Sequence, residues 1–218
     1  MDIALQFKIS QLFFNSVSLS VCDPLLYVIN RYTWRCSEEK LRDHYRANIG
    51  MNHLEIGPGT GKMLDTLNLP TTGIRLSLLD LGLSCLRRSK RRLERYHPNI
   101  YQCNILEPIN HISERFDSIC VNHLMHRIPQ GFHTKGIIFY HLKRLLKTDG
   151  VLFGSTVVSK GANQNLLSFC INWLFNMIGL YNNHDDSVIE LERALKTYYR
   201  DVSIKVSGST VLFSARPR

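Results

Sequence analysis

The stretch His53-Leu54-Glu55-Ile56-Gly57-Pro58-Gly59-Thr60-Gly61 decides the fold of this chain of 218 residues. Its first half has the apolar character of a buried strand, and its second half is a glycine turn. Residues 62–69 then carry apolar positions spaced for a helix. Three glycines within five positions let the backbone turn tightly and approach a ligand closely, and the free N–H groups at the helix start point toward that ligand. The stretch therefore predicts a ligand-binding unit of strand, turn and helix.

The spacing of the glycines separates two classes of ligand. A dinucleotide fold uses G-x-G-x-x-G, whereas here the third glycine comes one position early and Glu55 stands two positions before the first. In this respect the stretch resembles the S-adenosylmethionine (SAM) loop of class I methyltransferases, acid-x-Gly-x-Gly-x-Gly. SAM has no pyrophosphate, so a close-packed loop and an acid suit its cationic amino-acid end. An ordinary glycine turn is the alternative for the loop taken alone.

The resemblance implies SAM as cofactor, S-adenosyl-L-homocysteine as product, and binding residues at the ends of four strands. Residues 74–80 form the predicted second strand, and its last residue, Asp80, would accept the ribose hydroxyls. Many family members carry Asp where Asn104 stands near the adenine, and the carbonyl of Asn can still accept there. The full set of cofactor-binding residues that the resemblance implies is Glu55, Gly57, Pro58, Gly59, Thr60, Gly61, Asp80, Leu81, Asn104, Ile105 and Asn122.

The rest of the chain alternates strands and helices as this family does. Helical spacing occurs at 83–96, 133–147 and 185–198. Further strands are expected at 100–105, 116–123 and 151–158, with a turn at 148–150 and a closing hairpin at 200–206 and 210–215. The resemblance covers about residue 45 to residue 218. It implies a doubly wound α/β fold whose mostly parallel sheet of seven strands has the order 3-2-1-4-5-7-6, with the last strand antiparallel.

Two parts of the chain lie outside this alternation. Residues 1–50 are expected to form a helical extension or lid ahead of a SAM-binding domain at 51–218, and residues 1–22 to pack against that domain or a partner. An almost wholly apolar insertion between Ser159 and Asn183 is too short and too polar at its flanks for a membrane span. We expect it to be a buried helix or a wall over the acceptor pocket.

The N-terminal extension carries two helix-start signals. Asp23 is expected to cap a helix that has Pro24 at its first position and ends near Trp34. Ser37 is expected to cap a second helix, with acids in its first turn. On that second helix Tyr45 is a candidate lid over the SAM pocket, and plain core packing is the alternative.

Composition limits the partners and the compartment. The apolar and charged content is that of a soluble globular protein, and no basic leader or long apolar run predicts secretion or a membrane span. Six cysteines without a C-x-x-C pair indicate a reducing compartment, so a cytoplasmic location is expected. The formal net charge of +9 permits an anionic partner without demonstrating one.

The predicted helix at 83–96 concentrates positive charge. A solvated helix face is the simpler interpretation, and a stripe that contacts phosphates is the sharper one. Few aromatic residues interleave with the charges, so a stacking platform for single strands is not evident. Nucleic acid is therefore a partner that the pattern does not favour. The residues concerned are Arg87, Arg88, Lys90, Arg91, Arg92 and Arg95.

Methyl transfer from SAM asks little of the protein beyond alignment and, for some acceptors, removal of a proton. The candidate bases are His126 and His123, just past the fourth strand, with a structural histidine as the alternative for each. A zinc site made of these two and His133 lacks an acidic or thiol fourth ligand, so no metal is expected. Motifs for methylating base amines or pyrimidine carbons do not follow the strand.

Three classes of function compete for this sequence. A methyltransferase acting on a small molecule is favoured by the apolar insertion, which could wall an organic acceptor. An RNA or protein methyltransferase is favoured only by the basic helix and the net charge. The third is a SAM-binding protein without turnover. The acceptor atom (oxygen, nitrogen or carbon) and the oligomeric state stay open, with a homodimer among the options.

Overall fold

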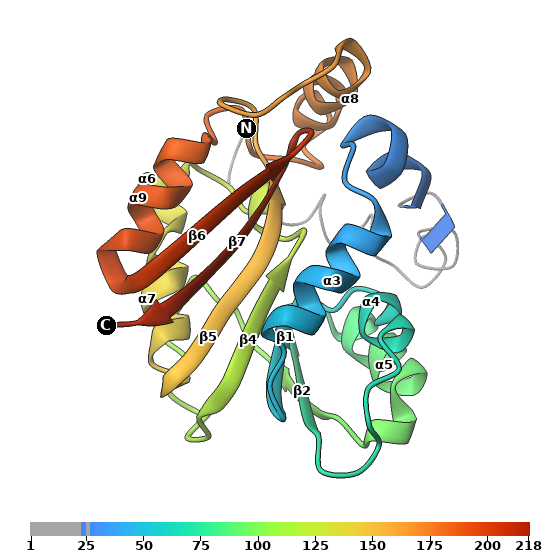
Figure 1. The fold of residues 1–218 in the computed structure, drawn as a ribbon, viewed down its shortest axis with the longest axis vertical. Coiled ribbons are helices and arrows are strands. Elements are labelled where there is room, and N and C mark those ends of the chain that lie inside the picture. The colour runs from blue at the N-terminus through green and yellow to red at the C-terminus, as the bar shows by residue number, and fades with distance from the viewer. Residues whose placement is uncertain (1–22, 25–26) are drawn as a thin grey trace.

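The computed structural model describes residues 23–24 and 27–218, so the interpretation of residues 1–22 lies outside the described part. Its sheet has the strand order β3-β2-β1-β4-β5-β7-β6, which confirms the predicted order (Figure 1). Neighbouring strands are parallel except at β7, which is antiparallel to both β5 and β6. The strands are β1 (Asn52–Ile56), β2 (Arg75–Asp80), β3 (Asn99–Gln102), β4 (Phe116–Asn122), β5 (Leu146–Val157), β6 (Tyr199–Ser207) and β7 (Thr210–Pro217).

The central strands are apolar on both faces because helices cover both faces. Successive residues alternate between two core clusters: Leu78 packs on one side and Leu79 on the other, as do Cys120 and Val121. Helices α3 (Glu38–Asn48), α4 (Lys62–Thr66) and α5 (Leu83–Arg92) cover one face. Helices α6 (Phe132–Lys135), α7 (Ile137–Lys143) and α9 (Val188–Tyr198) cover the other (Figure 1).

Helix starts follow their capping residues in part. The Ser37 hydroxyl accepts a hydrogen bond from the Lys40 amide and caps α3, as predicted. Asp23 is itself helical, and its carboxylate is bound to Thr60 and Arg92, so its predicted capping role is wrong. Tyr45 of α3 is buried against the sheet, so α3 contributes to the same core as the strands. The predicted boundary at residues 50–51, between a helical extension and a SAM-binding domain, stays a prediction.

Two expected helices are interrupted, and one expected turn is absent. The helical pattern at 83–96 ends as α-helix at Arg92 and continues as a 3₁₀ turn, Glu94–Tyr96. The pattern at 133–147 divides at Gly136, where a Cβ would collide with the Phe132 carbonyl. The predicted turn at 148–150 is wrong because these residues belong to β5, which has an irregular register against β4 there.

The apolar insertion forms α8 (Leu166–Met177), which Figure 1 shows at one end of the molecule, clear of the sheet. It contacts the π-helical turn η1 (Ile29–Thr33). Its apolar side chains are largely exposed, whereas the polar Ser168 and Asn172 are buried, so the expectation of a buried apolar helix is wrong. Within the described part of the chain, no helix is long and apolar enough to cross a membrane.

The tip of the β6–β7 hairpin holds the segment before α3. The Ser209 amide donates to the Trp34 carbonyl at 3.0 Å, and the Ser207 hydroxyl donates to the Arg35 carbonyl at 3.0 Å. Gly208 has φ +61°, and a Cβ there would collide with the Trp34 carbonyl. The hairpin tip therefore needs glycine for its conformation and for this contact.

Candidate active site

The glycine loop lies between β1 and α4, at the carboxyl end of the sheet. Gly57, Gly59 and Gly61 have φ of +67°, +55° and +77°, values that favour glycine. A Cβ on Gly57 would press on Leu124, and one on Gly61 would press on Ser89. A Cβ on Gly59 would meet nothing within 4 Å. The loop is thus packed below and open above Gly59, which leaves room for a ligand against its backbone.

Glu55 lies beneath this loop in a buried polar network. The Tyr45 hydroxyl donates to its Oε1 at 2.7 Å, and His53 Nε2 lies 3.1 Å from its Oε2. The other ring nitrogen of His53 contacts the Ser118 hydroxyl at 2.7 Å. Burial raises the pKa of Tyr45 well above its usual value, so this phenol stays a donor. Its contacts match core packing, the alternative to the lid interpretation.

The second acid of the predicted site, Asp80, ends β2. Its Oδ1 accepts from the Gly82 amide at 2.7 Å, which fixes the carboxylate at the strand end. Burial raises its pKa, and the positive charge of Arg127 opposes that rise. Because Arg127 follows β4, these two groups bring the ends of β2 and β4 within electrostatic reach of each other. Leu81 follows Asp80 directly and is half-buried.

The predicted adenine-side residues lie beyond β3, which ends at Gln102, earlier than expected. The Asn104 side chain closes its own turn: it accepts from the Leu106 amide at 3.1 Å and donates to Glu107 at 2.9 Å. Ile105 is buried in the core under α7, where its carbonyl contacts the His141 ring at 3.0 Å. Ligand contacts of Asn104 would have to compete with this turn.

His123 follows β4 directly and differs from its neighbour His126. It has φ +50°, in the left-handed region that non-glycine residues rarely adopt. Its Nε2 is buried and has no hydrogen-bond partner among the described residues. Burial lowers its pKa to about 4, so the ring is neutral at pH 7. Before it, the side-chain oxygen of Asn122, Oδ1, accepts a hydrogen bond from the Ser155 hydroxyl.

His126 is fully inside the protein, in a 3₁₀ turn, with 1% of its surface exposed. Its Nδ1 accepts the Val157 amide hydrogen at 3.2 Å, so the neutral ring carries its proton on Nε2. The ring packs on Tyr181 at 4.3 Å between centroids, and burial lowers its pKa far below the usual value. With its basic nitrogen already engaged, His126 fits the structural alternative, whereas the Nε2 of His123 has no partner among the described residues.

Comparison with known proteins identifies the family. A sequence model described as a methyltransferase domain matches residues 54–152. Methyltransferase aurB of Calcarisporium arbuscula is 33% identical, over 94% of this chain and 96% of its own length. The Physcion biosynthesis cluster O-methyltransferase of Aspergillus chevalieri is 34% identical, over 93% and 92%. The chain belongs to this methyltransferase family. It is a SAM-dependent enzyme, as the glycine loop predicted.

Solved structures share the fold of the methyltransferase at low sequence identity. The DhpI complex with S-adenosylhomocysteine has a TM-score of 0.68 at 15% identity, over 99% of this chain and 96% of its own. The N-methyltransferase NodS of Bradyrhizobium japonicum, also with S-adenosylhomocysteine, has a TM-score of 0.58 at 17% identity, over 81% and 83%. The glycine loop of the methyltransferase is open above Gly59 and so leaves room for SAM against its backbone.

A cluster of polar and charged side chains around the glycine loop was not predicted from the sequence. The Thr60 hydroxyl donates to Asp23 at 2.6 Å, and the Arg92 guanidinium contacts both Asp23 and Thr60 at 2.8 Å. Lys62, just past the loop, pairs with Glu38 at 2.6 Å. The two ion pairs join the segment before β1 to α5 and α4, and the Thr60 hydrogen bond joins it to the glycine loop of the methyltransferase. No local sequence pattern predicts contacts between residues so far apart in the chain.

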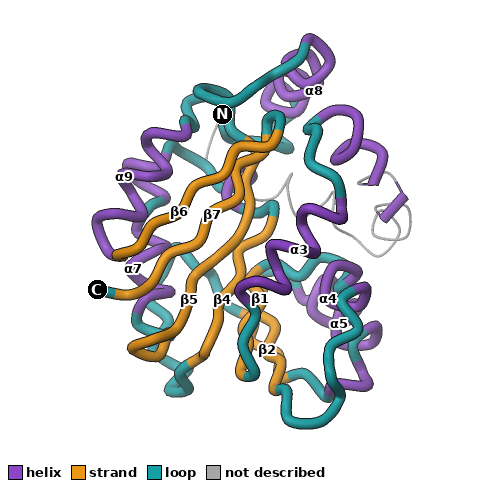
Figure 2. The backbone as a smooth tube through the Cα atoms, in the orientation of Figure 1, coloured by secondary structure: helices purple, strands orange, loops and turns teal. Residues whose placement is uncertain are grey.

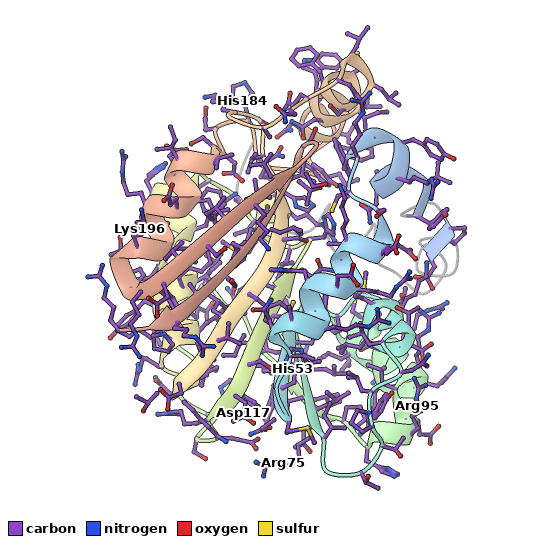
Figure 3. The ribbon with its side chains drawn as sticks, viewed as in Figure 1. His53, Arg75, Arg95, Asp117, His184 and Lys196 are labelled. Carbon is purple, nitrogen blue, oxygen red and sulfur yellow. The ribbon has the colours of Figure 1, made fainter. Side chains whose placement is uncertain are left out.

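The basic helix α5 of the methyltransferase is only partly a free cationic face. Arg92 is used in the loop cluster. Arg95, in the 3₁₀ turn that follows α5 and marked in Figure 3, pairs with Asp65 at 2.6 Å and lies over the Tyr96 ring. Asp65 raises the pKa of Arg95. Arg87 and Arg91 are exposed, as the solvated-face interpretation expects.

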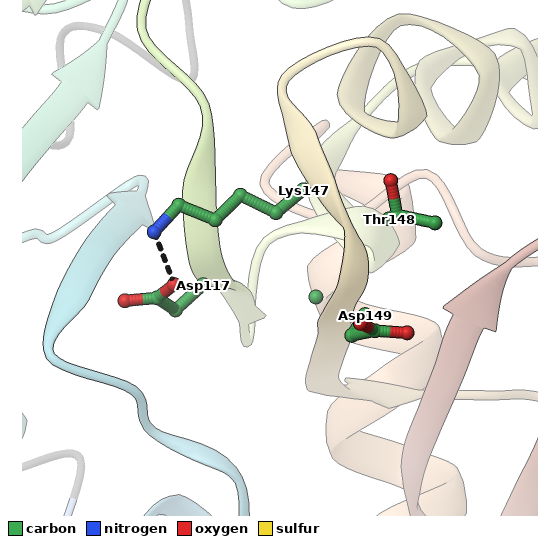
Figure 4. A pocket seen from close by; sticks show the side chains of 5 residues that line it. Asp117, Lys147, Thr148 and Asp149 are labelled. Atoms are coloured by element: carbon green, nitrogen blue, oxygen red, sulfur yellow. Dashed lines mark hydrogen bonds and ion pairs between the residues drawn. The ribbon is translucent and has the colours of Figure 1, made fainter.

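Two other features lie away from the crevice. His133 is exposed on α6, and the described residues hold no cluster of three or more metal-binding side chains. A surface hollow is lined by residues 147–150 and Asp117, which pairs with Lys147 at 2.6 Å (Figure 4). Asp117 is near the start of β4, at the opposite end of that strand from Asn122. None of the predicted site residues lines this hollow.

Proposed function

We propose that this methyltransferase transfers the methyl group of SAM to a hydroxyl group on a small organic molecule. The observation that carries the proposal is the buried, unpartnered Nε2 of His123 at the carboxyl end of β4. A neutral imidazole nitrogen in that position can accept the hydroxyl proton as the methyl group is transferred. Relatives named as O-methyltransferases support this choice, among them the demethylluteothin enzyme of Streptomyces thioluteus, 31% identical over 84% of this chain and 79% of its own length.

The chain itself supplies position and a proton acceptor. When bound, SAM supplies an electrophilic methyl group next to a good leaving group. In the proposal the backbone of Gly57, Gly59 and Gly61 holds the cofactor, and Asp80 accepts hydrogen bonds from its ribose. The carboxylate of Glu55 attracts the cationic amino-acid end of SAM from beneath the loop, where Tyr45 and His53 hold it. Alignment of the acceptor in line with the methyl group then lowers the barrier.

The pKa of His123 limits which kind of acceptor hydroxyl this residue can deprotonate. Lowered to about 4, it leaves the ring unprotonated at neutral pH but makes it a weak base. A weak base serves best when the proton that it removes is already acidic. We therefore infer a phenol or enol as acceptor in preference to an aliphatic alcohol.

An amine acceptor is the second candidate. N-methyltransferase vrtF of Penicillium aethiopicum is 35% identical, over 85% of this chain and 78% of its own length. A neutral amine is already a nucleophile, so its methylation would not depend on His123. Replacement of His123 thus separates the two acceptors.

The macromolecular alternatives have weaker support. Arg92 of α5 and Arg95 of the 3₁₀ turn after it are engaged within the chain, which leaves a smaller free stripe for phosphates. We also infer a cytoplasmic site of action. Its support is the set of six cysteines without a C-x-x-C pair.

The test follows radiolabelled methyl groups from SAM into an extract. We expect label in the small-molecule fraction, unchanged when the extract is first treated with nuclease or protease. Chemically defined phenols and amines of matched size then serve as acceptors for the purified enzyme. Label that disappears with nuclease or protease treatment contradicts the small-molecule proposal, and transfer to amines alone contradicts the hydroxyl proposal.

A further inference from the structure

The side of α8 that faces the protein carries polar residues together with Ile171 and Phe175, which pack against Trp34 and Tyr181. Ser168, Asn172 and Asn176 recur at intervals of four residues and so share one helix face. Asn172 donates to the Ser159 hydroxyl at 2.7 Å. Asn176 and Asn183 bond reciprocally, side-chain amide to side-chain oxygen at 2.7 Å and backbone amide to side-chain oxygen at 3.1 Å. These directed bonds fix the rotation of the helix about its axis.

The opposite side of α8 is apolar and uncovered. Leu166 is 80% exposed and Trp173 is 59% exposed. At about 200 Å² for a large apolar residue, the exposed area is on the order of 700 Å². That is close to the ~800 Å² per partner of a stable interface, and monomeric proteins rarely leave such a patch bare. The outer face of α8 consists of Leu166, Leu167, Phe169, Cys170, Trp173, Leu174, Met177 and Ile178.

Charge indicates what covers this outer face. Residues 161–183 contain no Asp, Glu, Lys, Arg or His, although the whole chain has a formal net charge of +9. Two copies of such a chain repel each other, so they meet most favourably where neither carries charge. A helix that lies on a membrane surface instead carries Lys and Arg on its polar side. The polar side of α8 is uncharged and already bonded to the body of the protein.

We propose that the outer face of α8 is the contact between two copies of this chain, related by a two-fold axis. A two-fold contact places the same patch on both partners. The two α8 helices then pack antiparallel, and residues near the helix middle meet their own counterparts. Cys170, exposed and near the middle of Leu166–Met177, lies close to the axis, and Trp173 and Leu174 pack around it.

The first experiment measures the mass of the full chain in solution. Sedimentation velocity should give a dimer at micromolar concentration and a monomer for the variant Trp173→Gln/Leu174→Gln. The control is Ile189→Gln, because Ile189 is 67% exposed on α9, away from the patch, and this variant should stay dimeric. Circular dichroism and the melting temperature check that each variant is folded. A monomeric wild type, or a dimer that survives both substitutions, overturns the proposal.

The second experiment tests the two-fold geometry. A short bis-maleimide should link two copies through Cys170 in the wild type and in Cys103→Ser, whose cysteine is half-buried elsewhere. The link should be lost in Cys170→Ser. Failure of Cys170 to cross-link a protein that sediments as a dimer overturns the antiparallel contact. Two other occupants of the outer face are possible outcomes: an anionic membrane surface, or residues 1–22 of the same chain. In both cases the first experiment shows a monomer, which contradicts the proposal.

Discussion

His123 and His126 are three positions apart and face opposite chemical situations. The basic nitrogen of His126 is engaged by a backbone amide, whereas the Nε2 of His123 has no partner among the described residues. The sequence shows only two histidines past a strand and cannot tell them apart. Which ring nitrogen is engaged depends on Val157, a residue of the neighbouring strand β5 that lies 31 positions away from His126.

Replacement of His123 by Gln should lower turnover with a hydroxyl acceptor by roughly 10²–10⁴-fold, because the proton acceptor is lost. SAM affinity, measured by calorimetry, should stay nearly the same. Since the pKa of His123 is about 4, wild-type turnover should show no acid limb from this group between pH 5.5 and 8. The control is His126→Phe, which should lower the melting temperature but leave the turnover of the folded protein nearly unchanged. Equal turnover in His123→Gln and wild type would remove His123 from the proposal.

Replacement of Asp80 by Ala should weaken SAM binding by about 1–3 kcal/mol, the value of hydrogen bonds lost from a neutral diol. The melting temperature should change little, and Asp149→Ala, an exposed acid on β5, serves as the control. Burial raises the pKa of Asp80. Affinity in the wild type should therefore decline on acidification at a higher pH than an ordinary aspartate would give. Unchanged calorimetric affinity in Asp80→Ala contradicts the ribose assignment.

Local sequence predicted part of the site and no more. The positions of Gly57 to Gly61, directly after β1, and of Asp80, at the end of β2, are recognisable from neighbouring residues; their contacts with SAM stay a prediction. The bond between Thr60 and Asp23 spans 37 positions, and that between Tyr45 and Glu55 joins a helix to a strand. Such pairs arise from tertiary packing, for which one sequence holds no spacing rule.

At the scale of elements, a buried ion pair ties three segments together. Lys135 of α6 and Asp186, just before α9, are fully buried and 2.6 Å apart. The Lys135 ammonium also lies 3.4 Å from the Ile128 carbonyl, in the segment after β4. In the same region, Asn182 donates from its backbone amide to the His126 carbonyl at 2.7 Å. The pair thereby holds together α6, the segment after β4 and the segment before α9.

Replacement of Lys135 by Met should lower the free energy of unfolding by about 3–5 kcal/mol, because it leaves the charge of Asp186 buried without a partner. The double variant Lys135→Met/Asp186→Leu should recover a large part of that loss. Denaturant unfolding of the three proteins measures both values. A double variant no more stable than the single one contradicts this account of the pair.

The same pair gives stability a pH dependence. Burial raises the pKa of Asp186 from 3.8 to about 6. A carboxyl whose folded pKa is raised binds more protons folded than unfolded, so its stabilising contribution is complete below pH 4 and is lost as pH rises through 6. Between pH 4 and 6.5 the wild type should lose stability relative to the double variant. An opposite slope in the unfolding free energy contradicts the raised pKa.

Elements were predictable where their periodicity is strong. Every predicted strand is present and Ser37 caps α3, because apolar runs and capping are local signals, but β3 ends earlier and β5 begins earlier than expected. The helix at 133–147 divides at Gly136, where close packing against Ala194 of α9 leaves no room for a Cβ. Helix α8 is apolar on most of its surface, so its sequence could not reveal that the few polar residues face inward.

At the scale of the whole molecule, positive charge is spread and not gathered into a binding face. Charge reversal at Arg87 and Arg91, both exposed, should leave methyl transfer to small molecules unchanged. RNA affinity should be weak in both the wild type and this variant. Filter binding at several salt concentrations measures it, since phosphate contacts release counterions and make affinity fall steeply with salt. Tight, salt-sensitive RNA binding that the reversal abolishes would overturn this ranking of partners.

The position of β7 has a consequence for biosynthesis. It follows every other strand in the chain, yet it lies between β5 and β6 (Figure 2). During translation one edge of β5 therefore stays unpaired until β7 has left the ribosome. An unpaired strand edge can pair with other chains and so favours aggregation. The hairpin then reaches back across 172 positions to Arg35. Contacts of such long range slow folding, so the nascent chain completes its core only after β7 has paired with β5.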